Sequence, residues 1–476
     1  MSNQLKRKYG LFTAICMVVG IVIGSGVFFK AQVILEKTGG DLFMGVIAWV
    51  IGGAIMLSCM LAFAFMGQKY EKVNGIVDYA EAAVGGNYGY LMGWFTTVIY
   101  LPAITSALAW LTARYTLEFL VSVGMPLGVG SNPVTGPECI ALALFFMVFS
   151  YTVNALSPKL AGKFQTSTTV IKMIPLGLMA VVGIIVGLVN GQLTANFAAP
   201  AQVAEGTGNP LFMAVCASAF AYEGWIIATS INSELKDSKK NLPRALIVGG
   251  IIIVAVYIFY YLGVAGGAPI ADLKNPNIGA PVAFTNIFGN VFGNILKLFI
   301  AVSCFGTLNG LMLGLSRCMF SMAARGRGPA PKVFGKVDDA TGMPSNSCVM
   351  ALFLAAFWLV YFYFTNLFAP IPDPQEAGKM IALASAGVPF AFDSTELPVI
   401  TVYMMYMPIF FQWMRKEKDQ NILRRFVMPG LAICGCAFMV VACVFSHKQA
   451  CIWYLIVFAV VVLLGWLLDT PNRKKQ

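Results

Sequence analysis

The chain has 476 residues, of which 58% are hydrophobic and only 11% are charged, and its formal net charge is +11. Soluble domains average about 45–50% apolar and about 25% charged residues, so this composition excludes a soluble globular protein. A positive charge of this size would suggest nucleic-acid binding in a soluble protein. Here the basic residues gather between apolar segments, so no nucleic-acid partner is expected.

Apolar segments long enough to cross a bilayer recur along the whole chain. A bilayer core about 30 Å thick needs about 20 helical residues per crossing. The run from Leu11 to Phe29 is too long for a signal peptide and lacks a small-residue cleavage site, so it is predicted as the first span. The twelve predicted segments cover residues 11–34, 43–66, 88–121, 139–157, 165–189, 210–232, 243–268, 283–323, 346–367, 397–413, 427–446 and 451–468. They predict one all-α integral membrane domain, residues 1–476, whose solvent is the lipid bilayer.

Two of these spans contain glycine where a membrane helix should be continuous. The first span carries Gly20 and the run Gly24-Ser25-Gly26, and the sixth carries Glu223-Gly224. Each glycine weakens a helix by about 1 kcal/mol relative to alanine, so these clusters favour local unwinding. Unwound backbone is tolerated at membrane depth only where it is buried or lines a cavity. We therefore predict that helices one and six are broken.

The two predicted breaks lie five spans apart, and the two spans cross the membrane in opposite directions. This pattern is typical of an inverted repeat of five plus five helices. The remaining two helices are then an addition at the C-terminal end. The expected divisions are a cytoplasmic N-terminus (1–10), repeat one (11–190), repeat two (210–415), helices eleven and twelve (426–468) and a cytoplasmic C-terminus (469–476).

The broken helices offer backbone groups that suit a free amino acid. A half-helix that starts after Gly24-Ser25-Gly26 would present free N–H groups and the positive end of its dipole to a carboxylate. Carbonyl groups released at Ile21, Phe220 and Ala221 would suit an ammonium group. The backbone alone could thus recognise a zwitterion, which leaves side chains to choose among amino acids.

Two ionisable side chains lie deep in the predicted spans. Lys172 lies about eight residues into the fifth span, which at 1.5 Å per residue is roughly 12 Å into the membrane. Ionisable residues at such depth are functional candidates, and Lys172 is predicted to bridge helices one and eight. Glu223 lies in the predicted break of helix six, where it could face the substrate, hold a proton or pair with a neighbour. Phe220 beside it is a candidate aromatic lid.

The basic residues predict the orientation of the chain. Positive residues collect on the cytoplasmic side of membrane proteins. With the N-terminus inside, 24 of the 32 Lys and Arg residues fall on that side, including the clusters at 6–8, 236–244, 317–336, 415–425 and 473–475. Both termini are therefore expected in the cytoplasm of a multi-pass protein of the cell membrane, and a bacterial inner membrane is the expected location.

The chain lacks the residue patterns of a metal centre or a catalytic site. Its eleven cysteines lie within or at the ends of apolar segments without C-x-x-C spacing, so they are expected to be small buried hydrophobic residues. The single histidine, His447, is expected in a polar loop. A zinc site, a Ser/His/Asp set and a cofactor are therefore not expected, and an enzyme is disfavoured.

Several motifs together resemble a known family. They are Val22-Ile23-Gly24-Ser25-Gly26-Val27-Phe28, Phe220-Ala221-Tyr222-Glu223-Gly224-Trp225, Glu234 with Asn241-Leu242-Pro243-Arg244, and Ser303-Cys304-Phe305-Gly306-Thr307-Leu308-Asn309-Gly310. On these motifs the chain resembles the L-type amino-acid transporters of the amino acid, polyamine and organocation superfamily, particularly bacterial serine/threonine-type exchangers. The similarity runs over nearly the whole chain.

The resemblance implies roles for particular residues. It implies that Ile23, Gly24, Ser25 and Gly26 bind the substrate carboxylate and that Phe220 gates the site, with its carbonyl near the ammonium. It also implies that Lys172 stands near a vacant sodium site and faces the hydroxyl groups of Ser303 and Thr307.

The function implied by the resemblance is sodium-independent exchange of small neutral L-amino acids such as serine, threonine and alanine by alternating access. Animal members pair by disulfide with a heavy chain through the loop after helix three. The corresponding loop here, Val121 to Pro137, has no cysteine, so no disulfide-linked heavy chain is expected.

Other transport classes remain open at this stage. A proton-coupled permease for amino acids, cationic amino acids or amines would use Lys172 or Glu223 as its proton carrier. A channel is less consistent with the sequence, which shows no repeated filter motif. The preferred amino acid, the oligomeric state and the direction of flux are not readable from the residues.

Overall fold

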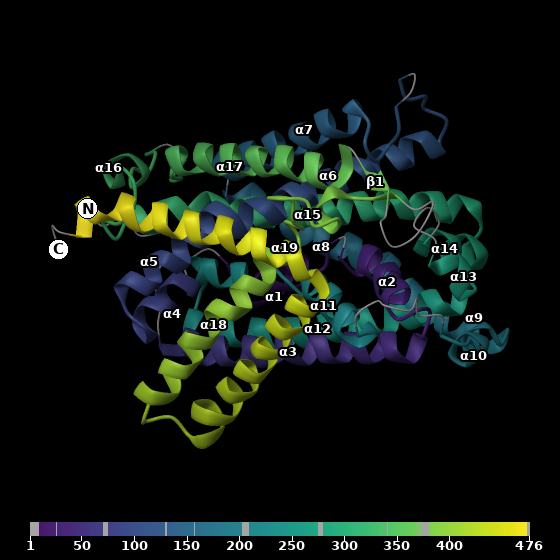
Figure 1. Cartoon of the computed structure of the whole chain (residues 1–476), viewed down its shortest axis with the longest axis horizontal. Coiled ribbons are helices and arrows are strands. Elements are labelled where there is room, and N and C mark those ends of the chain that lie inside the picture. Colours follow the sequence, from purple (N-terminus) through teal and green to yellow (C-terminus); the bar gives the residue numbers. More distant parts are fainter. Residues whose placement is uncertain are drawn as a thin grey trace.

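The structure of the chain is a computed structural model that describes residues 9–24, 26–69, 75–128, 131–156, 158–201, 209–274, 279–339, 341–368, 370–372 and 380–473. Figure 1 shows a bundle of long helices with short helices at both ends. The first half of the chain contributes α1 (Leu11–Val22), α2 (Gly26–Lys37), α3 (Leu42–Lys69), α4 (Gly75–Ala83), α5 (Gly86–Phe95), η1 (Thr96–Tyr100), α6 (Leu101–Ser122), α7 (Pro137–Leu156), α8 (Pro158–Leu178), η2 (Met179–Gly183), α9 (Ile184–Val189), α10 (Gln192–Ala198), α11 (Pro210–Ala221) and η3 (Trp225–Glu234). The second half contributes α12 (Ser238–Gly267), α13 (Ile270–Leu273), α14 (Gly279–Phe288), α15 (Asn290–Ala323), α16 (Pro331–Phe334), α17 (Ser345–Tyr363), η4 (Phe364–Phe368), the paired strands β1 (Ile371–Pro372) and β2 (Met380–Ile381), η5 (Leu383–Ser385), α18 (Leu397–Lys416), η6 (Leu423–Val427) and α19 (Met428–Arg473).

The prediction of twelve membrane-spanning helices is confirmed. Twelve helices among the described residues are long and apolar enough to cross a membrane, and each overlaps a predicted segment. They cover Leu11–Lys37, Leu42–Lys69, Gly86–Ser122, Pro137–Leu156, Gly162–Val189, Pro210–Thr229, Ser238–Gly267, Asn290–Ala323, Ser345–Phe368, Leu397–Lys416, Leu423–His447 and Gln449–Asp469.

Helices one and six are broken where the glycines predicted it. In the first span α1 ends at Val22 and α2 begins at Gly26. In the sixth span α11 ends at Ala221, and the 3-10 helix η3 begins at Trp225. Gly224 between them has φ of 101°, a left-handed conformation that L side chains rarely adopt.

The eighth predicted segment, 283–323, is two helices rather than one. The chain turns between α14 and α15 at Gly289, whose φ is 85°. An apolar pattern alone does not separate two helices joined by a single residue, and here a glycine in a left-handed conformation makes the turn. Only α15 is long enough to span the membrane.

Two expectations about single residues are wrong. His447 does not lie in a polar loop: it lies within α19, which contains both C-terminal spans and changes direction near its middle (Figure 1). Arg317 does not lie in a loop with its neighbouring basic residues, because it is inside α15 and only 2% exposed. Figure 1 places the C-terminal end of α19 on the left of the view, and we call this end of the bundle the terminal end.

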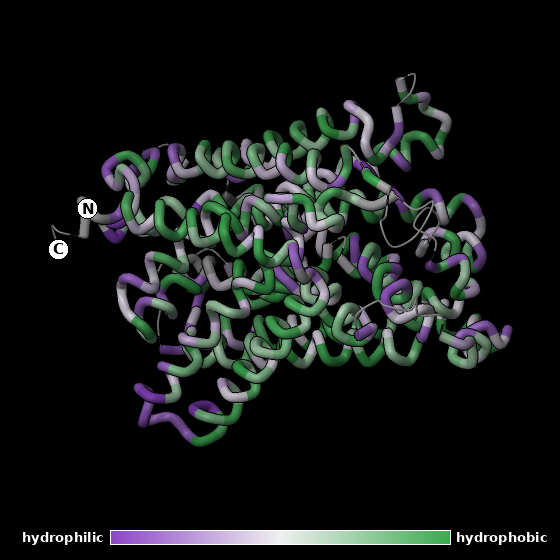
Figure 2. Tube along the Cα trace, viewed as in Figure 1, coloured by the Kyte–Doolittle hydropathy of each residue, from purple (hydrophilic) through white to green (hydrophobic). Residues whose placement is uncertain are grey.

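The spans differ in how much of their surface the protein covers. In Gly86–Ser122, 89% of the most apolar window is buried, whereas in Gln449–Asp469 only 17% is buried. The poorly covered spans carry many exposed apolar side chains, and a bilayer would solvate these without cost. Figure 2 shows this pattern along the chain, with hydrophobic residues over the long helices and hydrophilic ones gathered in the connections. The broken spans lie among the better covered helices.

Candidate functional site

The two helix breaks meet each other in the middle of the bundle. The half-helices α2 and α11 pack so closely that a Cβ atom on Gly26 would lie 2.6 Å from the Cα of Ala221. Real Cβ atoms essentially never come under 3.0 Å from another heavy atom. Gly26 therefore allows the two breaks to lie side by side.

Tyr257 of α12 joins the two breaks through its hydroxyl group. The hydroxyl oxygen lies 2.8 Å from the carbonyl oxygen of Ala221 and 3.1 Å from that of Val22. Both carbonyls are at the end of a half-helix, where no helical N–H follows to satisfy them. Tyr257 is fully buried, so one side chain satisfies and positions the C-terminal ends of α1 and α11.

A small cavity lies between the breaks. Its lining residues come from both breaks, from α6 and from α15: Ile21, Val22, Gly24, Gly26, Ile104, Leu108, Phe220, Glu223, Gly224, Thr307 and Leu311. Apolar side chains form most of its wall. Its polar character comes from backbone groups and from the side chains of Glu223 and Thr307.

The first turn of α2 opens onto this cavity. The first N–H groups of a helix have no partner inside the helix, and its dipole places positive potential at that end. Gly24 and Gly26 line the cavity and leave the backbone uncovered there. A carboxylate-binding role for these residues stays a prediction. Ser25, predicted at the same site, lies outside the described residues.

Lys172 of α8 lies behind the break of helix one and is fully buried. Its Nζ donates to the carbonyl oxygens of Gly20, at 2.8 Å, and of Ile23. It also lies 3.3 Å from the carbonyl oxygen of Ser303 and 3.3 Å from the Oγ1 of Thr307. The ammonium group thus has four oxygen atoms around it, drawn from the break of helix one and from α15.

The two hydroxyl groups of α15 reinforce the same contact. Thr307 Oγ1 lies 3.1 Å from the Gly20 carbonyl oxygen and 3.2 Å from that of Ile23, and Ser303 Oγ lies 3.3 Å from that of Gly24. Carbonyl and hydroxyl oxygens around an unwound helix form the kind of site that holds a monovalent cation in transporters. Here the amine of Lys172 occupies the centre of that set.

Comparison with known proteins places this architecture in a family. The model of the amino acid permease family matches residues 9–467, which is nearly the whole chain. The chain belongs to the amino acid permease family.

Similar proteins are transporters by name. The permease is 29% identical over 466 residues to the serine/threonine exchanger SteT of Bacillus subtilis (strain 168), an overlap that covers 94% of each protein. It is 28% identical to the human large neutral amino acids transporter small subunit 2, with 74% of this chain and 64% of that protein covered. It is 26% identical to the human Asc-type amino acid transporter 1, with 72% and 64% covered.

In this permease Glu223 is both paired and open to the cavity. Its Oε1 accepts a hydrogen bond from the hydroxyl of Tyr100, and the residue is only 5% exposed. Its other oxygen, Oε2, has no hydrogen-bond partner within the described part of the chain. A buried carboxyl oxygen without a partner is costly, so this atom is available to a substrate or to a proton.

Phe220, in the last turn of α11, lines the cavity. The Nζ of Lys30, in α2, lies 5.2 Å from the centre of the Phe220 ring, a distance typical of a cation–π contact. Lys30 also forms a buried ion pair with Glu396, immediately before α18. This pair connects the first span to the tenth directly beyond the aromatic side chain.

A second cavity lies next to Glu223 and is lined in part by Tyr100, Tyr406, Ile226 and Ile227. Ile226 and Ile227 belong to η3, the half of span six that leads toward the terminal end. Tyr100 faces this cavity and also holds Glu223, which faces the first. The two cavities thus lie on either side of the Tyr100–Glu223 contact.

The structure brings most of the predicted residues together. Ile21, Gly24, Gly26, Phe220, Glu223 and Thr307 line the first cavity, and Lys172, Ser303 and Ile23 form the contact behind it. Ala221 is not among the lining residues, and its carbonyl group accepts a hydrogen bond from Tyr257. The roles assigned to these residues stay predictions.

Sequence reasoning missed Tyr257, Tyr100, Lys30 and Glu396. Lys30 is a lone charge next to the apolar run of span one, which was a signal available in the sequence. The two tyrosines carried no such signal, since the chain has 17 tyrosines and nothing in their spacing separates these two.

Proposed function

We propose that this permease is a sodium-independent amino-acid exchanger for small neutral L-amino acids such as serine, threonine and alanine. The observation that carries the proposal is the cavity formed by both helix breaks, which Gly26, the first residue of α2, lines. The apolar side chains of Ile104, Leu108 and Leu311 in its wall would suit a small substrate side chain. The names of the relatives, an exchanger of serine and threonine and two amino-acid transporters, support the same substrate class.

In this proposal, hydrogen bonds with backbone groups replace the water that an amino acid loses on binding. The N–H groups at the start of α2 donate hydrogen bonds to the carboxylate, and the Phe220 carbonyl and Glu223 accept hydrogen bonds from the ammonium. The amine of Lys172 already lies among the carbonyl and hydroxyl oxygens behind the break. The transporter therefore needs no sodium ion to hold helices one and eight together. An amine fixed to the protein does not move with the substrate, which is why no sodium gradient would drive the cycle.

The proposed cycle is alternating access between two inverted five-helix repeats, residues 11–190 and 210–415. Phe220 and the Lys30–Glu396 ion pair close one side, and η3 with the Tyr100–Glu223 contact closes the other. We place the terminal end of the bundle in the cytoplasm of a bacterial cell, because the basic residues gather on that side. Cys139 is fully buried in α7, so in this proposal no heavy chain is linked through the preceding loop.

The test is uptake of labelled serine, alanine, threonine and arginine into proteoliposomes without sodium, with and without unlabelled amino acid inside. The proposal expects uptake that requires an internal amino acid and that ranks the small neutral ones first. Equal uptake into empty vesicles would exclude obligatory exchange. A preference for arginine would exclude the neutral substrate class.

A second candidate, a proton-coupled permease, is favoured by one observation. Glu223 has an oxygen without a partner inside the cavity, which a transported proton could occupy. The Glu223→Gln variant separates the two candidates, because glutamine keeps the shape and removes the proton site. Retained exchange with unchanged pH dependence supports the exchanger, and loss of uptake driven by a pH gradient supports the permease.

A further inference from the structure

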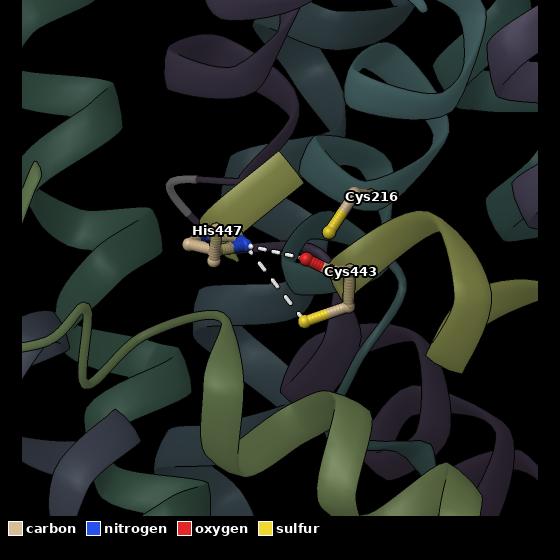
Figure 3. A group of neighbouring side chains, drawn as sticks. All are labelled: Cys216, Cys443 and His447. Atoms are coloured by element: carbon tan, nitrogen blue, oxygen red, sulfur yellow. Dashed lines mark hydrogen bonds between the residues drawn. The ribbon is translucent and has the colours of Figure 1, made fainter. Parts of the chain in front are cut away.

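Two cysteines and the single histidine of the chain come together beside the Lys30–Glu396 ion pair. Cys216 lies in α11, and Cys443 and His447 lie one helical turn apart in α19 (Figure 3). The two sulfur atoms and the Nδ1 or Nε2 atom of the imidazole lie within 4.8 Å of one another. Spans six and eleven are far apart in the sequence, so the expectation that these cysteines are only small buried hydrophobic residues overlooked this cluster.

The two nitrogen atoms of the imidazole ring have different neighbours. Nδ1 lies 3.7 Å from the sulfur and 3.4 Å from the backbone carbonyl oxygen of Cys443, and Nε2 lies 3.2 Å from Oε2 of Glu396. Metal-binding histidines usually donate their second N–H to a carboxylate, which fixes the tautomer and strengthens the ligand. Glu396 is itself fixed by Lys30 through its other oxygen.

We propose that Cys216, Cys443 and His447 bind a thiophilic metal ion of the Zn²⁺ class. Two sulfur ligands and one imidazole nitrogen suit zinc in tetrahedral coordination. With Zn–S bonds of about 2.3 Å, the ligand atoms of such an ion lie about 3.5–4 Å apart, so small side-chain rotations complete the site. Both thiols release their protons on binding. Water supplies the fourth ligand.

A hard cation does not suit the neighbouring carboxylates. Asp393 and Glu396 also lie close to His447, but Oδ1 of Asp393 accepts the backbone N–H groups of Thr395 and Glu396. Glu396 carries the ion pair with Lys30. The free ligand capacity is therefore on the sulfur side of the imidazole, which selects a soft metal over Mg²⁺ or Ca²⁺.

The site has an entry route and a consequence. The side chain of His447 is 15% exposed, whereas the two cysteines are buried, so the metal enters past the imidazole.

A bound ion would join α11, one half of the broken helix six, to α19. If the exchange cycle of the proposed function needs these elements to separate, the metal traps one conformation and inhibits exchange. At a metal concentration 100 times the Kd, that conformation is favoured about 100-fold over one that does not bind.

Binding is tested first on the purified full-length protein kept reduced with a phosphine. Cd²⁺ and Co²⁺ are titrated in, and thiolate-to-metal absorption is recorded, with Mg²⁺ as the negative probe. We expect one ion per chain with sulfur absorption, lost in Cys216→Ser and Cys443→Ser and weakened at least tenfold in His447→Gln. Thermal unfolding of each variant shows whether it is folded.

The matched control is a second buried cysteine pair. The sulfur atoms of Cys59 and Cys436 lie 3.7 Å apart between α3 and α19. Among the described residues, Cys59 and Cys436 belong to no group of three or more side chains that could hold a metal ion. The variants Cys59→Ser and Cys436→Ser should keep full metal absorption. Equal loss in both pairs, absorption that persists in Cys216→Ser, or a Cys216–Cys443 disulfide that survives the phosphine would overturn the proposal.

Inhibition is tested separately, so that it does not depend on the binding result. External Zn²⁺ should lower exchange in proteoliposomes and a chelator should restore it, whereas Cys443→Ser should exchange normally and resist Zn²⁺. Binding without inhibition would keep the metal site and remove its link to the exchange cycle. Absence of exchange with metal binding intact would overturn the proposed function alone.

Discussion

The hydroxyl oxygen of Tyr257 lies 2.8 Å from the carbonyl oxygen of Ala221, where α11, the first half of helix six, ends. The same hydroxyl reaches Val22 at the end of α1, so a residue of span seven fixes the geometry of both breaks. The position of the cavity therefore depends on a side chain that does not line it.

The Tyr257→Phe variant should weaken substrate binding without unfolding the protein. It leaves buried carbonyl groups without a donor, at a cost of about 1–3 kcal/mol, which corresponds to an apparent affinity lower by roughly 5- to 150-fold. The measurement is the concentration dependence of serine exchange in proteoliposomes. Tyr361→Phe is the control, because the Tyr361 hydroxyl also lies near two carbonyl oxygens, those of Phe390 and Phe392, away from the cavity. Equal effects in both variants would contradict the role of Tyr257.

The Gly26→Ala variant should abolish exchange. Its methyl group would lie 2.6 Å from the Cα of Ala221, a backbone atom that cannot move without separating α2 from α11. Overpacking of this kind destabilises by about 1–3 kcal/mol and displaces backbone. Gly430→Ala is the control, since nothing lies within 4 Å of a Cβ there. Exchange and thermal unfolding are measured on both, and wild-type exchange in Gly26→Ala would refute the close approach.

Lys172 should be essential because its amine satisfies oxygens of two spans. We expect Lys172→Met to lower the exchange rate at least tenfold and to reduce the unfolding temperature, as three buried carbonyl oxygens lose a donor. The Lys172→Ala variant has a shorter side chain, which leaves the carbonyl and hydroxyl oxygens around the former amine open to a cation. Na⁺ should therefore partly restore exchange. Wild-type exchange should not respond to Na⁺. Lys297→Met, at a partly exposed position of α15, is the control.

The Lys30–Glu396 pair should stabilise the conformation closed at the Phe220 side. Either substitution breaks the buried pair, at a cost of about 3–5 kcal/mol, so the second substitution has no pair left to break. Lys30→Met and Glu396→Gln should each speed the reaction of an external charged thiol reagent with a cysteine introduced by Phe220→Cys. The double variant should differ little from either single one. Additive effects on labelling would show that the two residues act independently.

Much of this molecule was predictable because the bilayer imposes a simple rule on the sequence. Each crossing needs a long apolar helix, so the twelve spans follow from hydropathy. The two breaks also follow from local chemistry, because glycine clusters such as Gly24-Ser25-Gly26 weaken a helix wherever they stand. The depth of Lys172 could be counted along its helix, and its partners on helices one and eight were predicted with it.

Only the tertiary structure decided which side chains support the breaks and what else they meet. Tyr257, Tyr100 and the pair Lys30–Glu396 act across spans that are separated by more than 30 residues in every case. Hydropathy indicates which residues are buried. In a bundle that is apolar nearly everywhere, it does not indicate which buried surfaces are in contact. The convergence of Cys216, Cys443 and His447 has the same origin: the packing of α11 against α19 brings Cys216 to the two residues of α19, and no spacing in the sequence indicates this packing.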